Sequence, residues 1–337
     1  TFQIRELKAI FMIRRLDIDA KADGNVCLIL HHFACFCKGF LDFCIPPVYN
    51  GNIVSVRKEA VMIHEKIKLF PDNDRVVLTT YLANDHEHYS SHVRPGMLVF
   101  PGGGYSNTSC REAEPIALAY VAAGFQVFVL DYSVTNSTSK PNIFRPLMEA
   151  SMAMAYIRTH AEAWHVDPDK IAIVGFSAGG HAAASLGTLW HEDYITSRLC
   201  IPAGSNKPNA MILGYPVITS GNKAHRGSFK NLLGEKQDDP ELLAYFSLEK
   251  QVSSLTPPTF LWHTAADTAV PVENSLLFAT ALAANQIPFE MHIYPEGRHG
   301  LSLCTPQVLN PQECPYMNHV AAWYDCSLKW MREVLMF

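Results

Sequence analysis

One serine in this sequence stands in a setting that could make it a nucleophile. Gly175–Gly179 reads G-F-S-A-G, with an apolar run, Lys170–Val174, before it and an alanine-rich stretch after it. A strand that turns sharply into a helix strains the backbone of such a serine and holds its hydroxyl clear of the sheet. The alternative is a glycine-rich turn with an incidental serine. Because a strand and a helix flank the motif as it requires, we expect Ser177 to be a nucleophile.

A serine hydroxyl attacks poorly until a base takes its proton and an acid orients that base. After a nucleophile of this kind, the acid and then the histidine are expected in that order, each beyond a later strand. Asp267 follows the apolar run Thr259–His263, and His299 follows the run Phe289–Tyr294. We therefore expect Asp267 and His299 to meet Ser177 at the C-terminal edge of a parallel sheet.

Each of these two assignments has an alternative. Asp267 could cap the helix that we expect to begin near Val272, although it lies rather far from that start. His299 could be a surface histidine, but its position, its place in the chain order and the neighbouring Gly300 favour a base. Glu296 is a rival acid, yet it is only three residues from His299 on the same loop.

A glycine run supplies candidate donors for a negatively charged oxygen. Pro101–Tyr105 reads P-G-G-G-Y and follows the apolar run Met97–Phe100. When a nucleophile adds to a carbonyl, charge develops on the oxygen, and fixed N–H groups stabilise it. We expect the backbone N–H groups of Gly103, Gly104 and Ala178 to form this oxyanion hole. Such a run alone is more often a flexible turn, but its place in a chain with G-x-S-x-G favours the functional interpretation.

These residues need a scaffold, and the sequence predicts one. Residues Met62–Leu69 and Val76–Leu82 are β-rich runs around a strong turn signal at Pro71–Asp74, which predicts an antiparallel hairpin. Short apolar runs then alternate with helical stretches, and this pattern predicts a mostly parallel, doubly wound α/β sheet with the hairpin at one edge. The other predicted strands are Met97–Phe100, Gln126–Asp131, Ile171–Gly175, Ala210–Gly214, Thr259–His263 and Phe289–Tyr294. The predicted helices are Arg111–Ala123, Phe144–Ala161, Ala178–Trp190, Val272–Asn285 and Asn318–Val334.

Composition separates a catalytic domain at 62–337 from an extension at 1–61, which has no clear period and is rich in cysteine. We expect this extension to contribute nothing to catalysis, although it could instead cover the exposed sheet edge. The chain has 337 residues, of which 48% are hydrophobic, and a net charge of -5. This charge gives no basic surface for nucleic acid or an acidic membrane.

Nine cysteines, an odd number, favour free thiols in a reducing compartment. No apolar stretch is long enough to span a bilayer and none has the design of a signal peptide, so we expect a cytoplasmic protein.

The motifs together resemble the α/β-hydrolase superfamily, and within it the bacterial acetyl esterases of the acetylxylan-esterase-like type. The likeness extends from Met62 to about the C-terminus. It is carried by Phe100–Tyr105, Arg111–Ala117, Asp167–Ile171, Gly175–Gly180 and Tyr215–Ile218. One departure is Pro101, where many relatives have a histidine that often braces the oxyanion loop.

The resemblance implies a carboxylic-ester hydrolase that deacetylates xylan- or mannan-type oligosaccharides or small esters through a Ser-His-Asp acyl-enzyme, with no metal or organic cofactor. A serine peptidase or lipid esterase is the first alternative, but we see neither propeller-like repeats nor a long hydrophobic lid. A non-catalytic binding protein on this fold is the second alternative, and such proteins usually lose one of the three catalytic residues. The sequence gives neither the oligomeric state nor the particular ester.

Overall fold

The computed structural model of this chain describes residues 62–85, 91–135 and 143–337. Its strands form one eight-stranded sheet in the order β1-β2-β4-β3-β5-β6-β7-β8. The strands are β1 (Lys66–Phe70), β2 (Asn73–Tyr81), β3 (Arg94–Phe100), β4 (Gln126–Asp131), β5 (Val166–Phe176), β6 (Ala210–Gly214), β7 (Thr259–Thr264) and β8 (Phe289–Tyr294). The helices include α3 (Glu114–Ala122), α4 (Arg145–Thr159), α5 (Ala178–Leu189), α6 (Asp193–Leu199), α9 (Glu273–Ala284) and α10 (Met317–Leu335).

Strand pairing confirms the predicted fold class. β1 pairs with β2 and β2 with β4 in antiparallel fashion, whereas the pairs from β4 through β8 are parallel. Parallel neighbours need crossover connections, and these are made by helices. The carboxyl ends of β3, β5, β7 and β8 therefore lie along the same edge of the sheet, where loops from distant parts of the sequence can meet.

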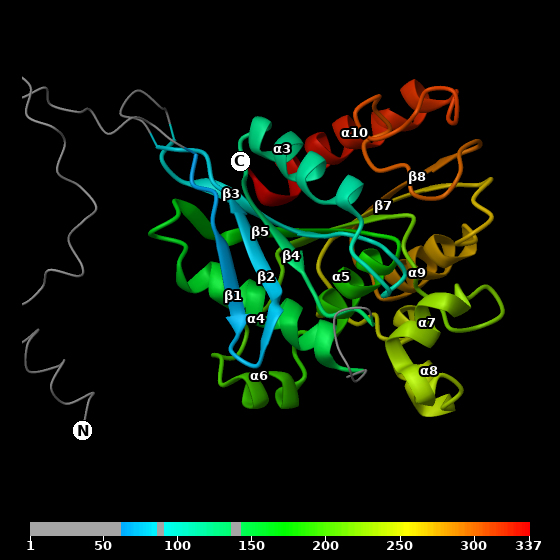
Figure 1. Cartoon of the computed structure of the whole chain (residues 1–337), viewed down its shortest axis with the longest axis horizontal. Helices are drawn as coiled ribbons and strands as arrows, with labels where there is room; N and C mark the ends of the chain where they lie inside the picture. The colour runs from blue at the N-terminus through cyan, green and yellow to red at the C-terminus, as the bar shows by residue number, and fades with distance from the viewer. Residues whose placement is uncertain (1–61, 86–90, 136–142) are drawn as a thin grey trace, which may run out of the picture. The chain divides into compact units, whose positions relative to one another are not determined.

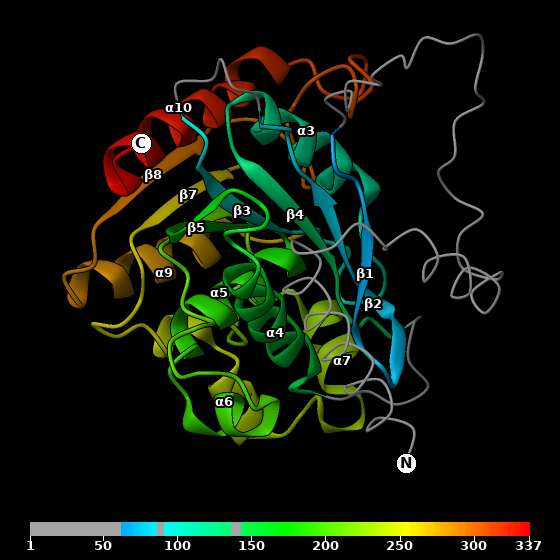
Figure 2. The same ribbon diagram turned by 90° about the vertical axis from the view of Figure 1, so that its left-hand side faces the viewer.

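Helices cover both faces of the sheet and create two separate cores. Helices α3 and α10 lie on one face, and α4, α5 and α9 lie on the other (Figures 1 and 2). Alternate residues of one strand supply the two cores, since successive side chains point to opposite faces. Leu98 of β3 packs with the α4–α5 side, whereas its neighbours Met97 and Val99 pack with the α3–α10 side. This double burial explains the continuous apolar runs in β3, β4 and β6.

Several elements differ from those predicted by sequence. The predicted helix Arg111–Ala123 begins as a short 3-10 turn, η1 (Cys110–Glu112), and only then continues as α3. The sequence analysis predicted no helix for α6 or for the segment between Ser220 and Thr256. That segment forms α7 (Arg226–Leu233), η2 (Gly234–Lys236), α8 (Pro240–Tyr245) and η3 (Leu248–Lys250). These helices have eight residues or fewer, too short to show a clear hydrophobic period.

The extension predicted at 1–61 lies outside the described residues, so the domain boundary at 62 stays a prediction. Five cysteines fall within the described ranges, and all five are free thiols. Among the helices in those ranges, none is both long enough and apolar enough to cross a bilayer.

Candidate active site

Ser177 occupies a strained turn between β5 and α5. Its φ of 53° and ψ of -121° lie in a region that residues with a side chain rarely adopt. Strand and helix approach so closely that a Cβ at Gly175 would collide with the carbonyl oxygen of Gly179. A Cβ at Gly179 would likewise collide with that of Phe100 on β3. The close approach of strand and helix therefore requires both glycines of G-x-S-x-G.

The three predicted side chains form one chain of hydrogen bonds. Nε2 of His299 lies 2.8 Å from Oγ of Ser177, and Nδ1 of His299 lies 2.6 Å from Oδ2 of Asp267. Asp267 and His299 come from the loops that follow β7 and β8, at the same sheet edge as Ser177. Residues separated by as many as 122 positions along the chain thus meet at hydrogen-bonding distance.

Asp267 is held by its own loop before it meets His299. Its Oδ1 accepts the backbone N–H groups of Ala269 and Val270, both at 2.9 Å. Its Oδ2 also lies 3.4 Å from Nε2 of the fully buried His263. Burial alone would raise the pKa of Asp267, but the contacts with His263 and His299 outweigh burial and hold this pKa well below its usual range. Asp267 is therefore a carboxylate at neutral pH.

The alternatives for Asp267 and His299 find no support in the geometry. The residue at the N-cap of α9 is Val272, so Asp267 does not cap that helix. Glu296 is exposed, and the partner of Nδ1 of His299 is Asp267.

The glycine loop after β3 leaves donors free beside Ser177. Gly103 and Gly104 have φ values of 127° and 64°, which suit glycine. Turns within the loop hold it in shape: Ser106 and Asn107 donate their N–H groups to the carbonyl oxygen of Gly103. Within the described chain, no acceptor takes the N–H groups of Gly103, Gly104 or Ala178. These are the three N–H groups that the sequence predicted for an oxyanion hole.

A buried carboxylate that the sequence analysis did not single out braces this loop. Glu112 is 3% exposed; its Oε2 accepts the N–H of Gly102 at 2.8 Å and its Oε1 accepts the hydroxyl of Tyr215 at 2.6 Å. The Tyr215 hydroxyl in turn accepts the N–H of Ser302 at 2.9 Å. The ring of Tyr215 stands edge-on to His299, with centroids 5.0 Å apart. Glu112 thus joins the glycine loop to the surroundings of His299.

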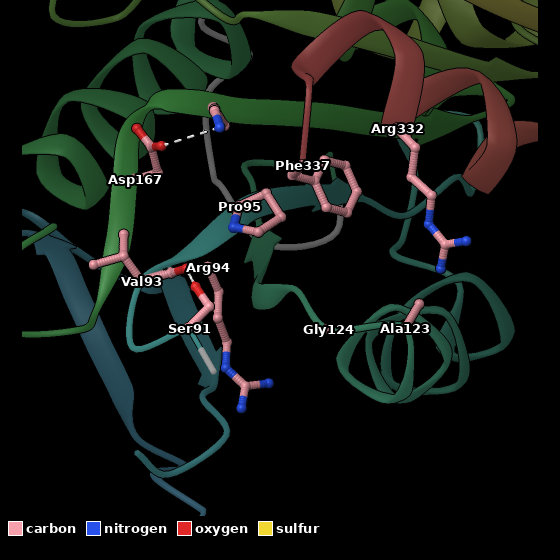
Figure 3. Close-up of a pocket in the computed structure, with 10 residues that line it drawn as sticks. Ser91, Val93, Arg94, Pro95, Ala123, Gly124, Asp167, Arg332 and Phe337 are labelled. Carbon is pink, nitrogen blue, oxygen red and sulfur yellow. Dashed lines mark hydrogen bonds and ion pairs between the residues drawn. The ribbon is translucent and has the colours of Figure 1, made fainter. Parts of the chain in front are cut away.

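Ser177 and His299 open into a cavity of about 390 Å³. Its rim carries several polar side chains, namely Asn107, Thr108, Ser109, Arg111 and His225. A larger cavity of about 610 Å³ lies at the opposite sheet edge, where β3 and β5 begin (Figure 3). The larger one is lined by Arg94, Lys170 and Arg332 and includes no histidine, so it offers no base for a serine. The smaller cavity is the candidate active site.

Tyr105 and His181 lie next to the glycine loop and the start of α5 in the sequence, but both are buried and neither lines the cavity of Ser177. The Tyr105 hydroxyl lies 2.8 Å from Nδ1 of His181, and Nε2 of His181 lies 2.9 Å from the carbonyl oxygen of Phe246. Burial lowers the pKa of His181 to about 4, so this ring is neutral. Among the described residues, no group of three His, Cys, Asp or Glu side chains could hold a metal ion.

Comparison with known proteins gives several matches. Residues 86–282, more than half of the chain, match the BD-FAE family. Endo-1,4-beta-xylanase B of Butyrivibrio fibrisolvens is 42% identical over 231 residues, which are 68% of this chain and 35% of that protein. Acetylxylan esterase of Xylanibacter ruminicola is 30% identical over 210 residues, which are 61% of this chain and 40% of that protein. The chain thus spans less than half the length of these two curated relatives.

A solved structure matches over nearly its whole length. The acetyl ester-xyloside bifunctional hydrolase of Caldicellulosiruptor lactoaceticus superimposes with a TM-score of 0.67 and 36% identity, covering 80% of this chain and 96% of that one. The fold and these relatives place the described domain among the α/β hydrolases, in the acetylxylan-esterase-like group. Within that class, the chain belongs to the BD-FAE family.

Proposed function

We propose that this protein is a serine esterase that removes acetyl groups from acetylated carbohydrate through an acyl-enzyme. The observation that carries the proposal is the continuous hydrogen-bonded chain from Ser177 through His299 to Asp267. Nucleophile, base and orienting acid are in contact in the order that acyl transfer requires.

In the acylation step, Nε2 of His299 takes the hydroxyl proton while Oγ of Ser177 forms a bond to the ester carbonyl carbon. The carbonyl electron pair moves onto oxygen, and the N–H groups of Gly103, Gly104 and Ala178 stabilise that charge. Asp267 keeps the proton of His299 on Nδ1 and stabilises the imidazolium. Collapse of the intermediate breaks the bond to the alcohol oxygen, which receives the proton from Nε2.

The deacylation step repeats this chemistry with water. His299 takes a proton from a water molecule, and the hydroxide oxygen adds to the carbonyl carbon of the acyl-enzyme. The tetrahedral intermediate then expels Oγ of Ser177, which regains its proton from Nε2. The products are the carboxylic acid and free enzyme, and no redox step is involved.

Two features support a short acyl group and a polar alcohol. Beside the glycine loop, Tyr105, His181 and Phe229 pack together and leave no space large enough for a water molecule, so a long acyl chain finds no room there. The cavity rim, in contrast, carries hydroxyl, amide and cationic side chains that can bind a polyhydroxylated alcohol. The names of the relatives, an acetylxylan esterase and an acetyl ester-xyloside hydrolase, agree with that choice.

A panel of esters tests this function. We expect the purified chain to hydrolyse acetylated xylo-oligosaccharides and p-nitrophenyl acetate. Among p-nitrophenyl esters, kcat/KM should fall by at least about tenfold from acetate to butyrate and again from butyrate to octanoate. Hydrolysis of peptide substrates, or a preference for octanoate over acetate, would contradict the proposal.

The brace formed by Glu112 gives a prediction about the oxyanion loop. Glu112→Ala frees the N–H of Gly102 and the hydroxyl of Tyr215, so the loop loses its fixed position. We expect kcat to fall by roughly 100-fold with a much smaller change in KM, because an oxyanion hole acts on the transition state. Steady-state kinetics with p-nitrophenyl acetate measures this split.

The exposed Glu114, on the same segment, supplies the matched control. Glu114→Ala removes the same type of side chain without touching the loop and should stay near the wild-type rate. Equal losses in the two variants would show that Glu112 has no special role in positioning the loop.

A further inference from the structure

Contacts at the N-terminus of α7 determine which ring nitrogen of His225, a second histidine in the cavity, carries the proton. Nδ1 of His225 accepts the backbone N–H of Ser228 at 3.2 Å and lies 2.9 Å from its hydroxyl. A backbone N–H can only donate, so Nδ1 has no proton of its own. The neutral ring therefore carries its proton on Nε2. His225 thus presents an N–H donor whose direction is set by the helix cap.

This donor is available to a molecule in the active site. The half-buried ring lines the same cavity as Ser177 and His299, and no acceptor within the described residues binds its Nε2. Burial, together with the neighbouring His299, lowers the pKa of His225, so the ring stays neutral at pH 7. In the free enzyme, water can accept a hydrogen bond from this half-buried N–H. A substrate that displaces this water must supply the acceptor itself.

The position of His225 relative to His299 indicates which part of an ester it meets. Both rings line the cavity into which Ser177 opens. In the proposed reaction His299 gives its proton to the alcohol oxygen, so the alcohol part of the ester lies against His299. Because His225 lines the same cavity, the alcohol is the part of the ester that we expect it to meet.

We propose that the Nε2–H of His225 donates a hydrogen bond to an oxygen atom next to the esterified one, and so selects alcohols with neighbouring hydroxyls. This inference rests on the proposed esterase function and deepens it. A sugar hydroxyl beside an acetylated position supplies the acceptor, whereas a simple aliphatic or aryl alcohol leaves the donor unpaired. A donor that the bound substrate covers but does not pair costs binding free energy, so esters without a neighbouring hydroxyl bind less well.

Two substrates that differ by a single hydroxyl provide the test, cyclohexyl acetate and the monoacetate of 1,2-cyclohexanediol. The quantity measured is the ratio of kcat/KM for the diol ester to kcat/KM for the simple ester. In the wild type we expect this ratio to be on the order of 10, the value of one neutral hydrogen bond.

Two variants distinguish the effect of the α7 helix cap from the effect of the Nε2–H donor of His225. In His225→Asn the amide oxygen takes the place of Nδ1 and keeps the cap, but the distal N–H is gone; the ratio should fall about 5- to 10-fold. In His225→Gln the amide nitrogen reaches the place of Nε2, so the ratio should stay within about twofold of wild type, even though the cap is weakened.

Each result has a definite meaning. A ratio that is unchanged in His225→Asn, or lower in His225→Gln than in His225→Asn, overturns the assignment of the Nε2–H donor. A wild type that cleaves both esters equally well also overturns it, while leaving the esterase function intact. If the wild type cleaves neither of these esters nor p-nitrophenyl acetate, the esterase function itself fails.

Discussion

Ser177→Ala is expected to reduce ester hydrolysis by several orders of magnitude, on the order of 10⁵-fold or more in kcat. The loss is large because the variant has no nucleophile, so His299 and Asp267 have nothing to activate. The residual rate should reflect only substrate binding and the N–H groups of Gly103, Gly104 and Ala178. Initial rates with p-nitrophenyl acetate, with the spontaneous rate subtracted, measure the effect.

Folding should hardly change in this variant. Alanine has the same backbone demands as serine at a φ of 53°, and the lost hydroxyl makes one described hydrogen bond, to His299. Ser185 on α5 is the matched control, since among the described residues its buried hydroxyl bonds to the carbonyl oxygen of His181 and to no catalytic residue. Ser185→Ala should keep near-normal turnover. Substantial activity in Ser177→Ala at an unchanged melting temperature would remove Ser177 from the mechanism.

The sheet could be predicted from the sequence because its signal is local. β4, β6 and β8 begin and end at the predicted residues. β4 and β6 are short apolar runs with a polar or glycine residue at an end, and β8 alternates apolar and polar residues between two prolines. The hairpin of β1 and β2 was visible in its turn residues, Pro71–Asp74. Local patterns of this kind do not depend on which other part of the chain lies opposite.

The three residues of the proposed triad could be placed for a related reason. Ser177 is marked by glycines that a tight strand–helix turn requires, and the structure gives steric grounds for Gly175 and Gly179. Asp267 and His299 were located by their position just beyond predicted strands, because parallel strands end at one edge. A local pattern and a general rule of topology were therefore sufficient to predict that these three side chains meet.

Glu112 and His225 illustrate what the sequence could not provide. Glu112 acts through Tyr215, 103 positions away, and no local pattern marks such a pair. An acidic residue at the start of an expected helix also has an ordinary explanation, because it interacts favourably with the helix dipole. His225 caps α7 although histidine is not among the preferred capping residues, so that helix start was not visible. The start of α8, by contrast, is marked in the sequence by a preferred capping residue, Asp239, followed by Pro240 at the first helical position.

Asp267→Asn should slow turnover by about 10⁴-fold while leaving the fold intact. The backbone N–H groups of Ala269 and Val270 point at Oδ1 and can only donate, so the amide oxygen of the asparagine must occupy that place. The NH₂ group is then directed at Nδ1 of His299 and His263. Because two donors cannot face each other, His299 moves its proton to Nε2 and can no longer accept the proton of Ser177. Kinetics at neutral pH measures this loss.

Glu296→Gln is the matched control for this prediction, because it makes the same chemical change in the rival carboxylate on the His299 loop. Glu296 is exposed, and the structure describes no contact between it and His299, so we expect a change of less than about twofold. If Glu296→Gln caused the large loss and Asp267→Asn the small one, the orienting acid would be Glu296. The tautomer argument gives a further distinction: Asp267→Asn should lower kcat far more than it raises KM, since His299 acts on the transition state and not on substrate binding. A loss that lay mainly in KM would show that Asp267 shapes the cavity and does not orient the base.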